Sequence, residues 1–259
     1  MEYNHIIFSI ENGVGKIVLN RPDVLNSFNT GMGAEVQAAL DQCDSDKFVR
    51  AVLLTGEGRG FCAGQDLEEA MSPNTKIEDI VRTTYNPIVL KIREIEKPVI
   101  CAVNGVAAGA GANIAFGCDL TLAASSAKFI QSFIKIGLIP DSGGTYILPR
   151  LAGMQRAAAM TMLGDKMTAN EAKEIGLIYQ VVEDDQLMSE ATALAEKLAR
   201  MPTVGLGLTK RGLNHGLKVD LPTQLEFEAD IQAAAAASKD YKEGVNAFLE
   251  KRAPTFTGE

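Results

Sequence analysis

Short apolar runs of the length that suits buried strands alternate with segments of helical periodicity over the first half of the chain. Residues 5–10 and 15–19 flank Asn12-Gly13 and predict a β-hairpin. Further strands are expected at 51–55, 99–103, 120–124 and 128–130, and helices at 30–44 and 77–96, the second interrupted at Asn86-Pro87. This alternation is typical of an α/β fold.

Beyond residue 145 the pattern becomes mainly helical. Thr168-Ala-Asn-Glu171 is a capping-box sequence ahead of a short helix. After it we expect one last strand at 177–182 and then helices at 186–200, 203–215, 222–238 and 240–252. The sequence therefore predicts an α/β core over residues 1–200 followed by an α-helical C-terminal region over residues 201–259.

The stretch from Pro98 to Asn113 joins an apolar run to an Asn-Gly turn, and from Ala107 to Ala112 it has no side chain larger than a methyl group. A strand that leads into a helix with so bare a first turn exposes backbone N–H groups where the helix dipole is positive, which favours an anion or a developing oxyanion. Close packing of helix on strand would require the same small residues. A dinucleotide site is disfavoured, because the run reads G-x-x-x-G-x-G and not G-x-G-x-x-G.

A second glycine-bearing turn, Phe61-Cys-Ala-Gly-Gln-Asp-Leu67, follows the expected strand at 51–55. Taken alone it is an ordinary transition from strand to loop, with Cys62 as a small apolar filler. Together the two turns are more informative. Backbone N–H groups from separate loops that converge on one oxygen form an oxyanion hole, which stabilises a transition state by several kcal/mol.

Asp141 is the candidate acid/base residue. It lies in Ile139-Pro-Asp-Ser-Gly-Gly-Thr145, where a turn or an N-cap role would also explain an aspartate. The mainly apolar run over residues 133–139 suggests that Asp141 borders an apolar cavity, and desolvation there would raise its pKa toward the range of a base catalyst. A serine-hydrolase triad is improbable, since the chain has no G-x-S-x-G elbow.

Composition narrows the partners. The net charge of -8 argues against nucleic acid, whose phosphates require a basic face. The 4 cysteines and 2 histidines show no metal-ligand spacing, so we expect reduced thiols and no metal site. The N-terminus does not look like a signal peptide and no apolar run is long enough to span a membrane. These features favour a cytoplasmic protein with no membrane partner.

Three segments with this order and spacing, 60–67, 102–111 and 137–145, together with Asn20-Arg-Pro22, resemble the signatures of the enoyl-CoA hydratase/isomerase (crotonase) superfamily. The resemblance covers essentially the whole chain. It implies a core of repeated ββα turns, a C-terminal trimerisation region and a homotrimer or dimer of trimers. It also implies an acyl-CoA thioester substrate with no separate cofactor, and an enolate stabilised by the N–H groups of Ala63 and Ala110.

The departures from the family pattern bear on the reaction. Hydratases of the superfamily use a pair of glutamates to handle water, and the matching positions here are Asn113 and Phe133. Since Phe133 cannot act as an acid or a base, the resemblance implies an isomerase with Asp141 as proton shuttle. Within the superfamily, the sequence most resembles a branch of ring-epoxide isomerases, which convert ring-1,2-epoxyphenylacetyl-CoA to oxepin-CoA in phenylacetate catabolism. Related members shift cis-3 to trans-2 enoyl-CoA double bonds.

The same resemblance implies binding roles. Gln65, Asp66 and Leu67 would lie along the CoA moiety, and Phe133, Tyr85 and Ile88 would shape the acyl pocket. The cations expected to meet the CoA phosphates are Arg21, Lys251 and Arg252.

Two other functions remain open from the sequence. The first is an enoyl-CoA hydratase that holds its water in another way. The second is a non-catalytic partner subunit of an acyl-CoA enzyme complex, which the presence of both bare turns disfavours. Association of an active isomerase with a related hydratase is a further expectation.

Overall fold

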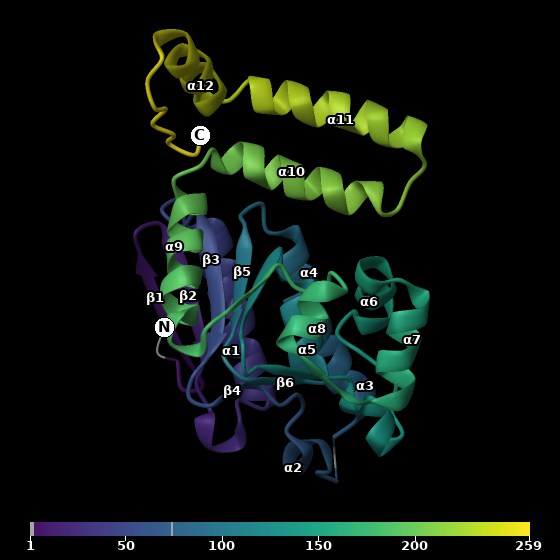
Figure 1. Ribbon diagram of the computed structural model, residues 1–259. Coiled ribbons are helices and arrows are strands. Elements are labelled where there is room, and N and C mark those ends of the chain that lie inside the picture. Colours follow the sequence, from purple (N-terminus) through teal and green to yellow (C-terminus); the bar gives the residue numbers. More distant parts are fainter. Residues whose placement is uncertain (1–2, 74) are drawn as a thin grey trace.

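The structure is a computed structural model that describes residues 3–73 and 75–259. Two β-sheets lie at the centre of the molecule (Figure 1). The larger sheet has the strand order β1 (Ile6–Glu11), β2 (Val14–Leu19), β3 (Ala51–Gly56), β5 (Val99–Val103), β7 (Leu120–Ala124) and β10 (Gln180–Val182). The smaller has the order β4 (Gly60–Cys62), β6 (Val106–Ala108), β8 (Lys128–Ile130) and β9 (Lys166–Thr168). Pairing is parallel except between β1 and β2 and between β8 and β9.

The chain alternates between the two sheets in a repeated ββα pattern, which confirms the predicted fold. From β3, β5 and β7 of the larger sheet it passes directly into β4, β6 and β8 of the smaller sheet, and helices follow each pair. Because β4 and β6 are parallel neighbours, with Cys62 opposite Ala107, the turns that follow them leave the sheet side by side. This pairing places two distant segments of sequence at one site.

The helices mostly match their predicted ranges. Those of the core are α1 (Thr30–Ser45), α2 (Leu67–Ala70), α3 (Ile77–Ile80), α4 (Asn86–Glu94), α5 (Ala110–Gly117), α6 (Gly144–Ala152), α7 (Met154–Leu163), α8 (Ala169–Glu174) and α9 (Leu187–Ala199). Single turns of 3-10 helix occur at Pro22–Val24, Ser132–Ile136 and Asp184–Gln186. The last strand is shorter than predicted, because 177–179 precede the ladder with β7, which begins at Gln180.

The interruption predicted at Asn86-Pro87 is a π-helical turn, Val81–Tyr85, between α3 and α4. Proline has no N–H to donate to the carbonyl four residues earlier, and its ring crowds that carbonyl. The carbonyl concerned, that of Thr83, instead accepts a hydrogen bond from the Gln37 side chain of α1 at 2.9 Å. The helical segment therefore continues past the proline, and a side chain of α1 replaces the hydrogen bond that the proline cannot donate.

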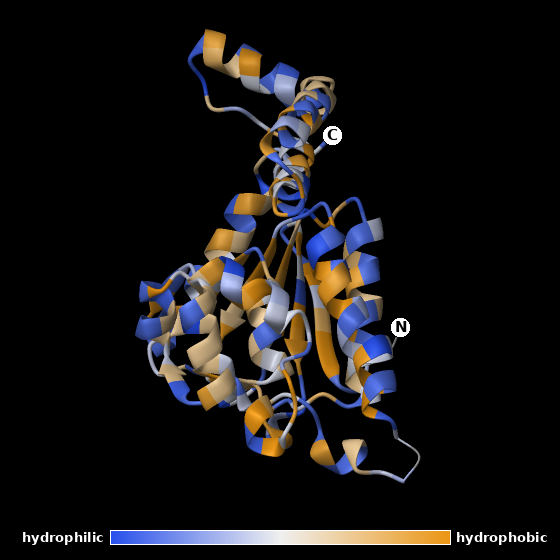
Figure 2. Ribbon diagram, turned by 90° about the vertical axis from the view of Figure 1, so that its right-hand side faces the viewer, coloured by the Kyte–Doolittle hydropathy of each residue, from blue (hydrophilic) through white to orange (hydrophobic). Residues whose placement is uncertain are grey.

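The core lies between the sheets and the helices that cover them, and Figure 2 shows the strands as mainly hydrophobic segments in the middle of the molecule. Every residue of β3 and of β5 is buried. Strands covered on both faces read as continuous apolar runs and not as alternating ones. This is the reason that runs such as 51–55 and 99–103 identified their strands from sequence.

The C-terminal helices α10 (Thr203–Gly216), α11 (Leu221–Ala236) and α12 (Lys239–Glu250) extend away from the sheets as an arm (Figure 1). The arm is anchored where buried Lys210 donates to the Ile92 carbonyl at 2.6 Å and pairs with Asp119 at 2.7 Å. It begins close to the boundary expected at residue 201. None of the described helices is long and apolar enough to cross a membrane.

Gly207 of α10 provides a test of how the arm is attached. A Cβ atom at this position would lie 2.4 Å from the backbone carbonyl oxygen of Glu96, so α10 would have to shift. We expect Gly207→Ala to lower the free energy of unfolding by about 1–3 kcal/mol, the usual cost of overpacking. Denaturant unfolding monitored by circular dichroism measures this change.

Gly205 offers the matched control on the same helix. Its added Cβ would meet nothing nearer than Pro202, at 3.8 Å. Because alanine has the higher helix propensity, Gly205→Ala should stabilise the protein by about 0.5–1 kcal/mol. Equal effects of the two substitutions would contradict the proposed close contact of α10 with the core.

Candidate active site

The turns after β4 and β6 touch because each has a glycine where they meet. A Cβ atom on Gly111 would lie 2.6 Å from the Cys62 Sγ atom. Gly64 has φ +96°, and a Cβ atom there would lie 3.0 Å from the Ala108 carbonyl oxygen. The small residues thus serve close packing, and the same packing brings the backbone of the two turns together.

The first residue of α5 is Ala110, and its N–H group is one of those that a helix leaves without an internal partner. Within the described chain no atom accepts a hydrogen bond from it. Gly109 precedes it with φ 52°, a conformation that favours glycine. The helix starts later than the sequence suggested, because residues 106–108 form the short strand β6 in place of a first helical turn.

The Ala63 N–H group is not free to act as the second donor. It donates to the Leu25 carbonyl at 2.9 Å, within a segment that runs beside β4. The next N–H group, that of Gly64, faces the Cys62 Sγ atom at 3.4 Å. The prediction that Ala63 supplies an oxyanion contact is therefore corrected by the backbone hydrogen bonding of this turn.

Gln65 carries the available N–H group of the turn. Phe28 donates to the Gly64 carbonyl at 2.7 Å and accepts from the Asp66 N–H at 2.8 Å, a parallel bridge centred on Gln65. In such a bridge the N–H of the central residue points away from its partner strand, here toward the side on which β4 pairs with β6. No described atom accepts a hydrogen bond from it. Sequence reasoning missed this donor, because alternation of direction along a strand appears only with the pairing.

Asp141 lies in the loop before α6, between Gly137 and the helix N-cap at Gly143. Burial raises the pKa of its carboxyl group, although the Ser142 hydroxyl, which donates to Oδ1 at 2.8 Å, acts in the opposite direction. Ser142 is itself buried and has φ 50°, a left-handed conformation that is costly for serine. The carboxyl group of Asp141 is thus partly desolvated and its pKa raised, as the sequence predicted, and the backbone of its loop is constrained at Ser142.

The positions that would carry glutamates in a hydratase are otherwise occupied. Asn113 is buried on α5, where its Nδ2 donates to the Asp141 carbonyl at 2.8 Å and its Oδ1 accepts from the Gln131 Nε2 at 2.8 Å. Phe133 is also buried, and its ring would lie 3.6 Å from a Cβ atom on Gly109, beside the bare helix start. Neither the Asn113 amide, with both ends engaged, nor the apolar Phe133 ring can act as an acid or a base here, whereas the Asp141 carboxyl group can.

Tyr85 closes the site from the π-helical turn. Its hydroxyl donates to the Gln65 Oε1 at 2.5 Å, and its ring packs edge-on against Phe28 with centroids 5.8 Å apart. Burial first, and then the nearby Cys62 and Asp141, raise the pKa of Tyr85, so its phenol stays protonated. Tyr85 and Ile88 are both buried, and their role in shaping the acyl pocket stays a prediction.

Asp66 and Leu67 begin α2 on the outer side of the turn. Partial burial would raise the pKa of Asp66, but hydrogen bonds from Arg21, at 2.9 Å, and from the first N–H groups of α2 hold it below its ordinary value. Leu67 is 53% exposed.

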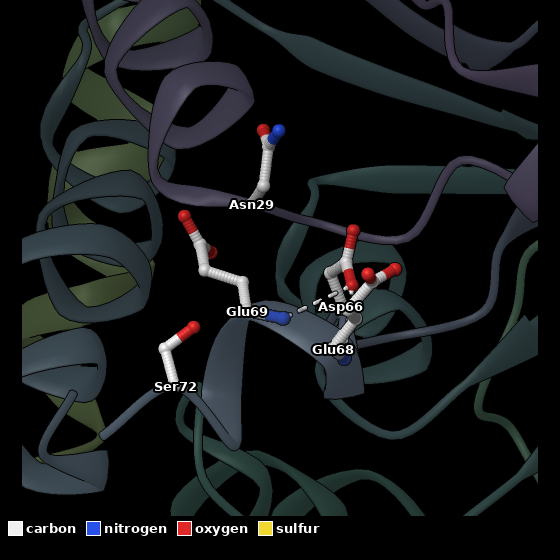
Figure 3. A pocket seen from close by; sticks show the side chains of 5 residues that line it. All are labelled: Asn29, Asp66, Glu68, Glu69 and Ser72. Carbon is white, nitrogen blue, oxygen red and sulfur yellow. Dashed lines mark hydrogen bonds between the residues drawn. The ribbon is translucent and has the colours of Figure 1, made fainter. Parts of the chain in front are cut away.

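A pocket of about 310 Å³ adjoins Asp66 and is lined by Asn29, Asp66, Glu68, Glu69 and Ser72 (Figure 3). Its carboxylates would repel the phosphates of CoA.

The structure separates the three candidate phosphate ligands. Arg21 lies beside the turn, paired with Asp66. Lys251 and Arg252 follow α12, the last helix of the arm (Figure 1), where Arg252 pairs with Glu243 and Glu250. Burial raises the pKa of Cys62 to about 12, so its thiol stays protonated at neutral pH. Among residues 3–73 and 75–259, no His, Cys, Asp or Glu groups of three or more could hold a metal ion.

Comparison with known proteins identifies the family of the chain. The sequence profile described as enoyl-CoA hydratase/isomerase matches residues 9–259. The 1,2-epoxyphenylacetyl-CoA isomerase of Escherichia coli K12 is 50% identical over 98% of both chains, and a "probable enoyl-CoA hydratase" of Rhodobacter capsulatus is 44% identical over 100% of both. An enoyl-CoA hydratase structure from Bacillus anthracis superposes with a TM-score of 0.93 at 36% identity, covering 99% of this chain and 100% of that one. The chain belongs to the enoyl-CoA hydratase/isomerase family and has its crotonase fold.

Proposed function

We propose that the protein is an acyl-CoA isomerase in which Asp141 moves a proton along an enolate. The observation that carries the proposal is the position of Asp141, a carboxyl group with a raised pKa in a site that has Asn113 and Phe133 where a hydratase has glutamates. The Ala110 N–H and, in place of Ala63, the Gln65 N–H would hold the thioester oxygen. Two preorganised donors stabilise the charge that the oxygen gains.

The proton transfers follow from this arrangement. With a 3-enoyl thioester, the Asp141 carboxylate removes a proton from C2 and the electron pair moves onto the thioester oxygen as a dienolate. The protonated carboxyl group then returns the proton to C4, which leaves the double bond between C2 and C3. One carboxyl group can perform both steps without water, whereas hydration requires groups that position and deprotonate a water molecule.

We further propose ring-1,2-epoxyphenylacetyl-CoA as the main substrate, with oxepin-CoA as product and phenylacetate catabolism as the setting. This rests on the 50% identity with the E. coli enzyme of that name. The aromatic rings of Tyr85 and Phe133 near the two turns suit a cyclic acyl group. Gln65, Asp66 and Leu67 would follow the CoA moiety, and CoA is part of the substrate, so no separate cofactor is needed.

We also propose that the protein forms a homotrimer or a dimer of trimers through the C-terminal arm, and that it associates with a related hydratase. Large apolar side chains are exposed along it, namely Leu213, Leu217, Leu221, Leu225, Phe248 and Leu249. Exposed apolar surface on this scale is typical of protein interfaces.

Asp141→Asn tests the proton shuttle. We expect kcat to fall by about 10²–10⁴-fold, the usual contribution of a general base, with little change in the affinity for acyl-CoA. Turnover of cis-3-enoyl-CoA and of the ring epoxide measures the first quantity, and calorimetric titration with a saturated acyl-CoA measures the second. Asp184→Asn is the control, since Asp184 lies on the surface and accepts from Ser126. Turnover close to wild type in Asp141→Asn would overturn the mechanism.

The raised pKa of Asp141 predicts two effects of pH. Since the ionised carboxylate is the base, the acidic limb of kcat/KM should lie above the ordinary aspartate pKa of about 3.9. Because the pKa of Asp141 is higher in the folded than in the unfolded state, ionising this group is costlier in the folded protein. The free energy of unfolding therefore falls as the pH rises through the folded-state pKa. Asp141→Asn should therefore raise the Tm at neutral pH and leave it unchanged at a pH below both pKa values. A lower Tm of the variant at neutral pH would contradict the desolvation of Asp141.

One absorbance assay separates the isomerase from the hydratase, the candidate that the 44% identity with the R. capsulatus protein favours. Isomerisation of a cis-3-enoyl-CoA creates a conjugated thioester and raises the absorbance, whereas hydration of crotonyl-CoA removes the conjugation and lowers it. We expect the rise and little or no fall, because Asn113 and Phe133 cannot activate water. Rapid hydration of crotonyl-CoA would establish the hydratase.

A further inference from the structure

A chain of buried side-chain amides connects β8 to the loop that carries Asp141. Gln131, the residue after β8, donates from Nε2 to the Asn113 Oδ1 at 2.8 Å. Asn113 donates from Nδ2 to the backbone carbonyl of Asp141, also at 2.8 Å. Both amide residues are 1% exposed, so the links are shielded from water. Hydrogen bonds in such an environment are stronger, and costly to leave unmade.

The orientation of both side-chain amides is determined by the final acceptor, the Asp141 carbonyl. A backbone carbonyl can only accept, so Asn113 must turn its Nδ2 toward Asp141 and its Oδ1 toward Gln131. Gln131 in turn must present its Nε2, and its own Oε1 is left buried with no partner among the described residues. A buried polar atom without a partner carries a free-energy cost. The orientation toward Asn113 is maintained in spite of that cost.

The space around Asn113 leaves little freedom to its side chain. A Cβ atom on Gly144, the first residue of α6, would lie 2.4 Å from the Asn113 Nδ2. The Gly144 N–H also donates to the Asp141 carbonyl, at 2.8 Å. That carbonyl is therefore held by two donors, one from its own turn and one from α5.

We propose that Asn113 is a positioning residue for Asp141, and that Gln131 fixes the orientation of the Asn113 amide. The inference rests on the proposed function of Asp141 as proton shuttle. Asn113 belongs to the first turn of α5, where its own N–H bonds to the Gly109 carbonyl and where Ala110 offers its N–H to the thioester oxygen. Through the Asp141 carbonyl, this one turn sets the separation between the enolate oxygen and the carboxyl group that moves the proton.

The position that carries a carboxylate in a hydratase thus has a different task here. An ionised carboxylate at 113 would face the Asp141 carbonyl with an acceptor and would repel it. The amide is required because it accepts on one side and donates on the other. This explains why the chain can have a polar residue at this place and still lack a second acid/base group.

Asn113→Leu tests the inference, because leucine has the same branching at Cγ but no hydrogen-bonding atoms. We expect kcat to fall by about 10²-fold, which a displacement of about 1 Å can cause, while KM and the dissociation constant of a saturated acyl-CoA change by less than about twofold. Gln131→Met removes the outer link and should give a smaller fall in kcat with the same unchanged binding. It remains informative if Asn113→Leu does not fold.

Thr121→Val is the matched control. Thr121 lies on β7, and its buried hydroxyl donates at 2.7 Å to the carbonyl of Ala115 on α5, the helix that carries Asn113. This variant should lose stability but keep its kcat. If Asn113→Leu and Gln131→Met keep wild-type kcat, or lose binding and turnover together, the positioning role is wrong. If instead Asp141→Asn is fully active, it is the proposed function that fails.

Discussion

The contact between the turns after β4 and β6 is the constraint on which the rest of the site depends. The two strands are parallel neighbours, so both turns leave the smaller sheet at the same edge. The contact requires Gly64 and Gly111, since a Cβ atom at either would meet the opposite turn at 3.0 Å or less. This approach brings Gln65 and Ala110, whose N–H groups have no acceptor among the described residues, to the same edge of the sheet. A strand pairing, and not a side chain, thus brings together the two backbone donors to which we assign the thioester oxygen.

Two aspartates beside these turns show how environment separates their roles. Asp66 is partly buried but accepts hydrogen bonds from Arg21 and from the start of α2, and these hold its pKa down. Asp141 is more deeply buried, and the effect of burial outweighs that of the hydrogen bonds to its carboxyl group, so its pKa is raised. One carboxylate therefore serves as an ion-paired helix cap, and the other has the raised pKa that the proposed proton shuttle requires.

Much of the fold could be predicted because its central strands are covered on both faces. Their apolar runs, such as 51–55 and 99–103, have no competing interpretation as surface helices. The short strand β6 was missed, since Val106–Ala108 has too little apolar surface to distinguish it from a bare helix start. Residues 177–179 look like strand for the opposite reason, being apolar but outside the ladder with β7. The local pattern of apolar residues indicates which segments are buried, whereas strand pairing depends on the neighbouring segments in the folded chain.

The sequence by itself determined the family resemblance, the two bare turns, Asp141 as the acid/base candidate, and the absence of glutamates at 113 and 133. Each of these depends on the kind of residue at a position. Only the tertiary structure decided that the Ala63 N–H is already bonded to Leu25 and that the Asn113 amide holds the Asp141 carbonyl. The direction of an N–H group and the partner of a buried amide are set by segments distant in sequence, because each hydrogen bond requires a second atom that the local pattern does not contain.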